Sequence, residues 1–145
     1  MCTYGSSNAP VQPGSGGGGR GLTDGSGGYG GGLIRLEVDG VATINGTLTA
    51  NGTDGYFHGS GSGGGIYVRC RVFTGLNGTL TANGAAGSGG SGAGGGGRIA
   101  IVRVRDTLNG SWTITAGGGT EPTWPGEDGT ILWLNPPWGT IFLIH

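Results

Sequence analysis

The segment Gly78-Thr79-Leu80-Thr81-Ala82-Asn83-Gly84 decides the fold because the chain contains it more than once. An earlier copy is Gly46-Thr47-Leu48-Thr49-Ala50-Asn51-Gly52, and a diverged later copy is Ser111-Trp112-Thr113-Ile114-Thr115-Ala116-Gly117. The first threonines of the three copies are 32 and 34 residues apart. A period of this size is typical of proteins built from stacked structural repeats.

Apolar residues around these copies keep the same period and alternate two positions apart, which predicts strands rather than helices. Stacked strands form parallel sheets with like residues about 4.8 Å apart. We therefore expect an all-β chain, a parallel β-helix (β-solenoid) of about three and a half coils. Its core ladder is predicted to consist of Ile34, Ile66, Ile99, Ile131, Leu36, Val68, Ile101, Trp133, Ile44, Leu76 and Leu108.

Each coil is expected to hold two strands and a glycine-rich leg. The first strands are predicted at 33–38, 66–72, 98–104 and 129–134, and the second strands, each with a bend at Asn-Gly, at 41–50, 73–82 and 106–116. The 145 residues then form a single domain, 1–145, with coils at about 14–51, 52–83, 84–116 and 117–145.

Glycine makes up 40 of the 145 residues, and it does not recur at every third position as a collagen triple helix requires. Fixing a run of about fourteen glycines costs on the order of 10 kcal/mol relative to alanine. The runs are either flexible loops or extended, polyproline II-like strands that lie side by side and share backbone hydrogen bonds. Their matching lengths favour the second interpretation.

Charge and hydropathy exclude several classes of protein. Seven arginines, no lysine and eight acids give a net charge of −1, which argues against nucleic-acid binding. No run of about 20 apolar residues is long enough to span a membrane, and Met1-Cys2-Thr3-Tyr4 does not resemble the start of a signal peptide.

Candidate catalytic and metal-binding residues are few. The acids are scattered, and only Glu127 and Asp128 are adjacent. His58 lies near Asp54 and Tyr56 in a glycine run, but a metal site needs more ligands than this group supplies. We expect no enzymatic activity, no metal site and no cofactor.

The two cysteines are too few for a disulfide scaffold. Cys70 falls at the same repeat position as Val38, which predicts a small buried side chain rather than a reactive thiol. A disulfide between Cys2 and Cys70 is the alternative.

Asparagine occurs at the predicted bends, at Asn45, Asn77 and Asn109, each followed by Gly and then Ser or Thr. This pattern predicts either N-glycosylation or a ladder of stacked asparagines, and Asn51 also begins such a sequence. Glycans on rungs about 4.8 Å apart would collide, which favours the ladder for the first three residues. For Asn51 both possibilities stay open.

The Thr-x-Thr pairs of the repeat should project outward in ranks, on either side of inward Leu48, Leu80 and Ile114. Such flat threonine arrays on β-solenoids resemble the surfaces of ice-binding proteins, although threonine is also an ordinary outward strand residue. The possible binding face consists of Thr47, Thr49, Thr79, Thr81, Thr113 and Thr115.

The order of the glycine runs and strands resembles the glycine-rich repeats of very large, adhesin-like surface or secreted proteins of bacteria and single-celled eukaryotes. The resemblance implies a parallel β-helix, an extracellular or cell-surface location and no catalytic residues. Those relatives are long arrays, whereas this chain forms one short array. The segments that carry the resemblance include Gly30-Gly31-Gly32-Leu33-Ile34-Arg35-Leu36, Asn45-Gly46-Thr47-Leu48-Thr49-Ala50-Asn51-Gly52, Gly65-Ile66-Tyr67-Val68, Gly94-Gly95-Gly96-Gly97-Arg98-Ile99-Ala100-Ile101 and Gly129-Thr130-Ile131-Leu132-Trp133-Leu134.

The C-terminal segment is apolar on both faces and shows no polar cap, so we expect it to bury against a partner. This assembly edge is predicted to contain Trp133, Trp138, Ile141, Phe142, Leu143 and Ile144. The expected function is a non-enzymatic structural protein, the protomer of an extracellular fibre or cell-surface adhesive array whose coils stack end to end. The expected partner is a second copy of the chain, with surface glycans as a further possibility. The alternative is an ice- or polysaccharide-binding module that uses the threonine face.

Overall fold

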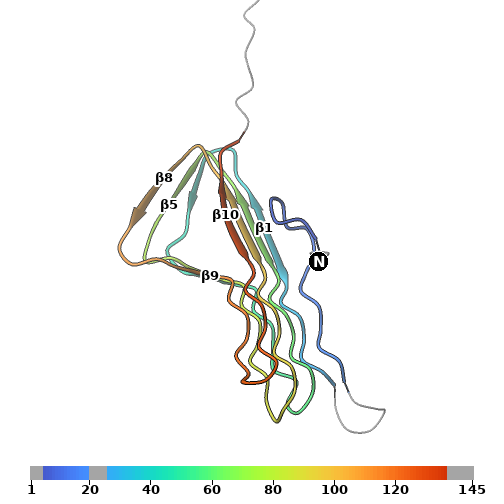
Figure 1. The fold of residues 1–145 in the computed structure, drawn as a ribbon. Helices are drawn as coiled ribbons and strands as arrows, with labels where there is room; N and C mark the ends of the chain where they lie inside the picture. Colours follow the sequence, from blue (N-terminus) through green and yellow to red (C-terminus); the bar gives the residue numbers. More distant parts are fainter. Residues whose placement is uncertain (1–4, 20–25, 137–145) are drawn as a thin grey trace, which may run out of the picture.

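The computed structural model describes residues 5–19 and 26–136 and shows an all-β chain wound into about three coils. Figure 1 shows a three-sided stack from which paired glycine-rich legs project at one corner. Successive coils lie directly on one another, and the predicted β-solenoid is confirmed. The described residues contain no helix, and therefore none long and apolar enough to cross a membrane.

Each complete coil contributes one strand to each of three parallel sheets. The first sheet has the order β1-β4-β7-β10, the second β2-β5-β8 and the third β3-β6-β9. The strands are β1 (Leu33–Glu37), β2 (Val41–Thr43), β3 (Thr47–Thr49), β4 (Gly65–Arg69), β5 (Val72–Leu76), β6 (Thr79–Thr81), β7 (Arg98–Val102), β8 (Arg105–Asn109), β9 (Thr113–Thr115) and β10 (Thr130–Leu134).

The predicted second strand of each coil is two strands in different sheets. In the first coil, β2 ends at Thr43 and β3 begins at Thr47, so the Asn45-Gly46 bend is a full corner. Asn and Gly suit such a corner because both tolerate backbone conformations that other residues avoid. The three-sided cross-section follows from this corner.

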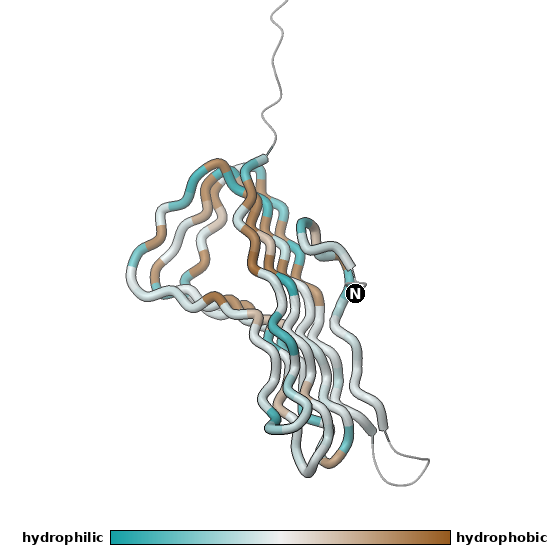
Figure 2. Tube along the Cα trace, in the orientation of Figure 1, coloured by the Kyte–Doolittle hydropathy of each residue, from teal (hydrophilic) through white to brown (hydrophobic). Residues whose placement is uncertain are grey.

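Strand pairing in the first sheet confirms the register of two predicted ranks: Ile34, Ile66, Ile99 and Ile131 form one, and Leu36, Val68, Ile101 and Trp133 form the other. On the last strand, Ile131 and Trp133 are each 38% exposed and lie outside the buried core. Phe73 and Leu80 complete a core that is fully buried in the second coil. Figure 2 shows apolar residues concentrated on the three-sided stack, while the legs are nearly neutral in hydropathy.

The third predicted rank is wrong at Leu76. Gly75, and not Leu76, pairs with Leu108, and Ile44 donates its backbone N–H to Thr74, the residue before Gly75. Leu76 consequently points outward and is 55% exposed, whereas Ile44 and Leu108 pack against the core. Two changes of length cause this. Three residues separate β1 from β2 but two separate β4 from β5, and 15 residues separate β3 from β4 but 16 separate β6 from β7. Residues that lie 32 apart in the sequence are therefore not always partners in neighbouring strands.

The glycine-rich legs are numbered in chain order: the first is described at residues 14–19 and 26–32, and the others run over residues 50–64, 82–97 and 116–129. Over these residues the legs are extended, hydrogen-bonded segments, as their matching lengths predict. Gly61 and Gly64 donate backbone N–H groups to Thr53 and Ala50 across the second leg, and the corresponding bonds recur in the other legs. Between neighbouring legs, Gly28 donates to Gly59 and Gly31 donates to Ser62. Donors and acceptors both recur every third residue, which is the period of a polyproline II strand.

Close approach of the backbones explains why these positions are glycine. A Cβ atom added to Gly61 would overlap the carbonyl oxygen of Tyr29, and one added to Gly94 would overlap the carbonyl oxygen of Gly61. The hydrogen bonds between legs offset part of the entropy lost by ordering glycine.

Candidate functional site

The threonine face lies on the outer surface of the third sheet. Strand pairing aligns Thr47 with Thr79 and Thr113, and Thr49 with Thr81 and Thr115. The intervening Leu80 is fully buried, so the threonines on either side of it project outward as predicted. The Thr81 hydroxyl donates to the Thr49 hydroxyl at 3.1 Å, which links neighbouring coils.

A second threonine rank, which the repeat motif did not reveal, lies on the adjoining sheet. Thr43, Thr74 and Thr107 are paired across β2, β5 and β8. The Thr107 hydroxyl donates to the Thr74 hydroxyl at 2.9 Å, and the Thr74 hydroxyl donates to the Thr107 carbonyl at 2.8 Å. Alignment of the three strands by register, rather than by motif, would have found this rank.

The corner asparagines use their side chains to join one coil to the next. The Oδ1 atom of Asn45 accepts the backbone N–H of Leu76 at 2.9 Å, and that of Asn77 accepts the N–H of Ser111 at 2.8 Å. Asn77 has a φ of 55°, a left-handed conformation that asparagine tolerates. These bonds are those of a ladder. The Nδ2 atom of each asparagine, which would carry a glycan, takes no part in these two hydrogen bonds.

Two further asparagines form a ladder at the start of the legs. Asn51 Oδ1 accepts the N–H of Asn83 at 2.7 Å, and Asn83 Oδ1 accepts the N–H of Gly117 at 2.8 Å. Asn109 lies exposed at the end of β8, on the last coil of its sheet.

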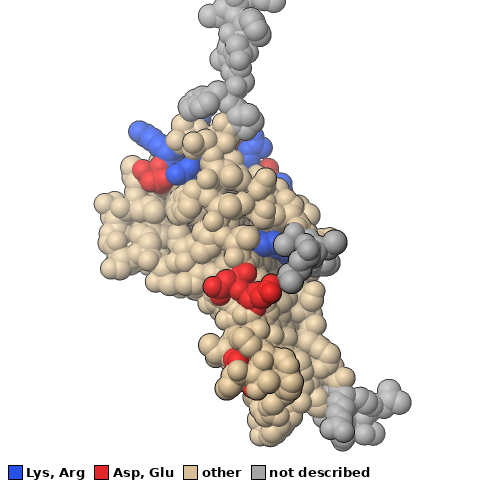
Figure 3. Space-filling model, in the orientation of Figure 1, with Lys and Arg blue, Asp and Glu red and all other residues tan. Residues whose placement is uncertain are grey.

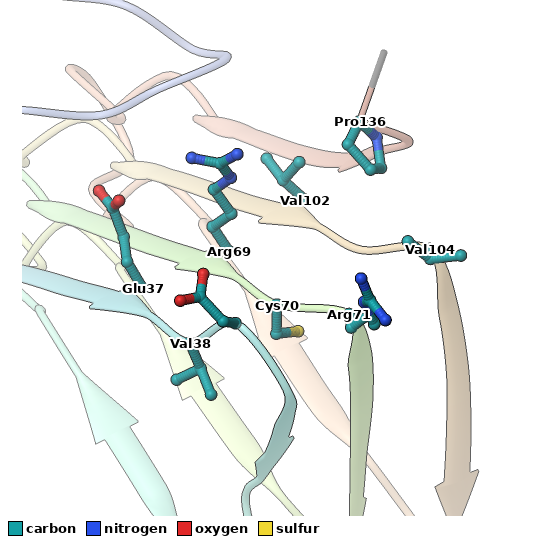
Figure 4. Close-up of a pocket in the computed structure, with 9 residues that line it drawn as sticks. Glu37, Val38, Arg69, Cys70, Arg71, Val102, Val104 and Pro136 are labelled. Atoms are coloured by element: carbon teal, nitrogen blue, oxygen red, sulfur yellow. The ribbon is translucent and has the colours of Figure 1, made fainter. Parts of the chain in front are cut away.

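Cys70 lies at the corner between the first two sheets and is 6% exposed, as its repeat position predicts. Figure 4 shows it on the floor of a groove between Arg69 and Arg71. Burial raises the pKa of the Cys70 thiol, and this outweighs a backbone hydrogen bond at Ala42 and the positive charge of Arg103, which both lower it. Cys2 lies outside the described residues, and so does the alternative disulfide.

The predicted assembly edge is described only at Trp133, because Trp138 and residues 141–144 lie outside the described residues. Trp133 is 38% exposed, and its ring lies 5.8 Å from that of Phe73. Trp112 packs on the same phenylalanine at 5.4 Å. Trp133 of β10 and Trp112, which lies just before β9, thus both pack on Phe73.

An ion pair beside Trp133, at inward positions of the third coil, was not predicted from the sequence. Arg103 Nη2 lies 2.9 Å from Asp106 Oδ2, and its Nη1 donates to Asn135 Oδ1 at 2.9 Å. Asp106 is the strand partner of buried Phe73 and so shares its inward face. The third coil therefore carries polar residues where the second carries Cys70 and Phe73. A comparison of the three coils position by position in the sequence would have revealed these polar residues at inward positions.

Charged residues are unevenly distributed. On the face seen in Figure 3, arginines gather near the end of β10 together with some acids. Most of this group borders the first corner: Arg69, Arg71, Arg103, Arg105, Glu37 and Asp39. The charged side chains described on the legs are acidic: Asp54, Glu121, Glu127 and Asp128.

The described residues include no group of three or more His, Cys, Asp or Glu side chains that could hold a metal ion. His58 lies half-buried near the tip of the second leg. Comparisons with protein-family models, curated proteins and solved structures gave no match.

Proposed function

We propose that this chain is a non-enzymatic structural protein, the protomer of an extracellular fibre or cell-surface array in which coils of neighbouring copies stack end to end. One observation carries the proposal. Ile66, Val68 and Leu80 of the second coil are fully buried, whereas the equivalent residues of the first coil are only half-buried. A further coil laid on the first one would bury them in the same way.

The backbone edges favour the same contact. Among the described residues, β1, β2 and β3 are each paired on one side only, and so are β8, β9 and β10 at the other end. Parallel pairing of one copy's last coil with the next copy's first coil would repeat the internal register. Such a head-to-tail contact does not close, and it generates a filament. The extracellular location is part of the proposal and rests on the resemblance to adhesin-like repeats.

The edge of β2 offers a direct test. Ile44 donates its N–H to Thr74, and donors alternate sides along a strand, so the Thr43 N–H faces away from β5. Proline at this position removes only the outward donor. We expect filaments of the wild-type protein by electron microscopy, dispersed particles for Thr43→Pro and filaments for the matched variant Thr43→Val. Dispersed wild-type particles at high concentration would contradict the proposal.

The threonine face supports a second candidate, binding of ice or of a polysaccharide. Its six threonines form two ranks in register, with Thr47, Thr49 and Thr113 exposed. An ice-binding face predicts thermal hysteresis that is lost in Thr81→Tyr. The matched change Thr107→Tyr, on the neighbouring sheet, should leave the hysteresis intact. Absence of hysteresis in the wild-type protein would remove ice binding.

A further inference from the structure

The turn at the tip of the second leg holds two aromatic residues in a conformation that the neighbouring leg forms with glycine. Tyr56 and Phe57 have φ values of 38° and 66°, and Gly89 and Gly90 at the tip of the third leg have values of 59° and 82°. A left-handed conformation costs a non-glycine residue on the order of 1 kcal/mol or more. Glycine forms the same turn in the third leg without this strain. The two aromatic residues therefore lower the stability of the turn, and the fold itself does not need them there.

Burial does not compensate for this cost. Tyr56 is 73% exposed and Phe57 is 61% exposed. The two rings meet edge to face with centroids 4.7 Å apart, and one side of the Phe57 ring lies against Gly89. The pair therefore presents aromatic surface to solvent at the far end of the legs, away from the core of the stack.

A polar frame fixes the aromatic turn in place. Asp54 Oδ1 accepts the Tyr56 N–H at 2.9 Å and the Ser88 hydroxyl at 3.1 Å, and the Phe57 N–H donates to Ser88 Oγ at 3.3 Å. Ser88 belongs to the third leg, so two legs hold the turn. Within the described residues, the other carboxylate oxygen of Asp54 accepts no hydrogen bond. A rigid aromatic surface thus lies beside an available acceptor.

We propose that Tyr56, Phe57 and Asp54 form a binding site for a neutral hexopyranose unit of a polysaccharide. The C–H groups of a sugar ring would lie against the negative faces of the aromatic rings, and a sugar hydroxyl would donate to Asp54. The site is independent of coil stacking between copies.

The size and charge of the site favour this ligand. Two aromatic side chains of about 150–250 Å² each supply too little surface for a stable protein interface, which needs about 800 Å² per partner. Asp54 and the acids of the fourth leg disfavour anionic polymers and anionic lipid surfaces.

Native electrophoresis in gels containing dextran, mannan or a β-1,3-glucan tests the proposal. We expect the wild-type protein to be retarded in at least one gel and Tyr56→Gly/Phe57→Gly to migrate as in a gel without polysaccharide. Because glycine removes the strain, the melting temperature of this variant should equal or exceed that of the wild-type protein. Tyr29→Ala, which removes a similarly exposed aromatic ring from the first leg, is the matched control and should stay retarded. Asp54→Asn should weaken binding about fivefold, because a charged acceptor becomes neutral.

Three results would overturn the proposal. The wild-type protein could migrate normally in all three gels. The double glycine variant could be retarded as strongly as the wild-type protein. Finally, the protein could float with phosphatidylcholine vesicles only when the aromatic pair is present, while its retardation by every polysaccharide is the same without the pair. This result would mean that the aromatic pair binds a lipid surface.

Discussion

Adjacent glycines of the first leg have opposite surroundings. Gly31 is buried, and a Cβ atom added to it would overlap the carbonyl oxygen of Ala50, whereas one added to Gly32 would meet open space. The backbone overlap at Gly31 cannot be relieved by moving a flexible side chain. Glycine content alone therefore does not show which glycines the fold needs.

These two positions give a matched pair of variants. Gly31→Ala should destabilise the protein by about 1–3 kcal/mol through overpacking. Gly32→Ala should be neutral, or stabilise by up to about 1 kcal/mol, since alanine restricts the unfolded chain. Urea unfolding followed by circular dichroism measures both changes. Equal effects of the two substitutions would mean that the legs are not packed as described.

The Cys70 thiol should react slowly in the folded protein. Its burial limits access, and its raised pKa leaves less thiolate, the reactive form, near neutral pH. In a Cys2→Ser background, labelling by a thiol reagent at pH 8 should be at least about tenfold slower in buffer than in denaturing urea. Equal rates in both solutions would show that this corner of the stack is open.

Among the elements, the asparagine ladder connects coils at points where the strands have ended. Asn83 is half-buried, and its Oδ1 atom accepts the N–H of Gly117 at 2.8 Å. Asn83→Ala should cost about 1 kcal/mol because it leaves this N–H without its acceptor. Asn83→Asp keeps an acceptor oxygen and should be close to wild type in urea unfolding. If Asn83→Ala leaves the free energy of unfolding unchanged, this ladder has no role in stability.

The strands of the first sheet could be predicted from the sequence because Ile34, Ile66 and Ile99 lie in the most regular part of the repeat. The broken second strand could not, since alternation continues through Asn45-Gly46 while the chain turns a corner. Leu76 was misplaced because a corner that is one residue shorter and a leg that is one residue longer change the register, while Ile44, Leu76 and Leu108 keep a spacing of 32 residues. Strand periodicity indicates the inward face but does not report how many residues a corner uses.

The candidate sites were predictable to different degrees. The outward threonines follow directly from alternation around Leu48 and Leu80. The aromatic turn at Tyr56 and Phe57 could not be predicted, because its signal is a left-handed backbone next to a glycine turn in another leg. That comparison requires coordinates for both legs.

At the scale of the whole molecule, the two ends of the stack differ in polarity. The first coil presents inward apolar side chains, including Ile44 and Leu48, which are half-buried. The third coil presents the Arg103–Asp106 pair beside Trp133, whose ring lies 5.1 Å from the Arg103 guanidinium carbon. Inward charges on an edge strand oppose the addition of another strand. The proposed end-to-end contact would therefore be weaker at this point than the contacts between internal coils.

Replacing the pair should strengthen that contact. In the double variant Arg103→Val/Asp106→Ala, the third coil regains side chains of the kind found at Val38 and Ala42 of the first coil. The pair is partly exposed in the single chain and would become buried in the proposed contact. Exchanging a buried ion pair for apolar residues stabilises by about 1–4 kcal/mol, so the protein concentration for half-maximal association should fall at least about tenfold. Analytical ultracentrifugation over a concentration series measures this fall. Asp106→Ala alone, which leaves Arg103 without its carboxylate, should weaken association. If the double variant associates no better than the wild-type protein, the third coil is not part of the contact, and the first-coil edge must pair with a different surface.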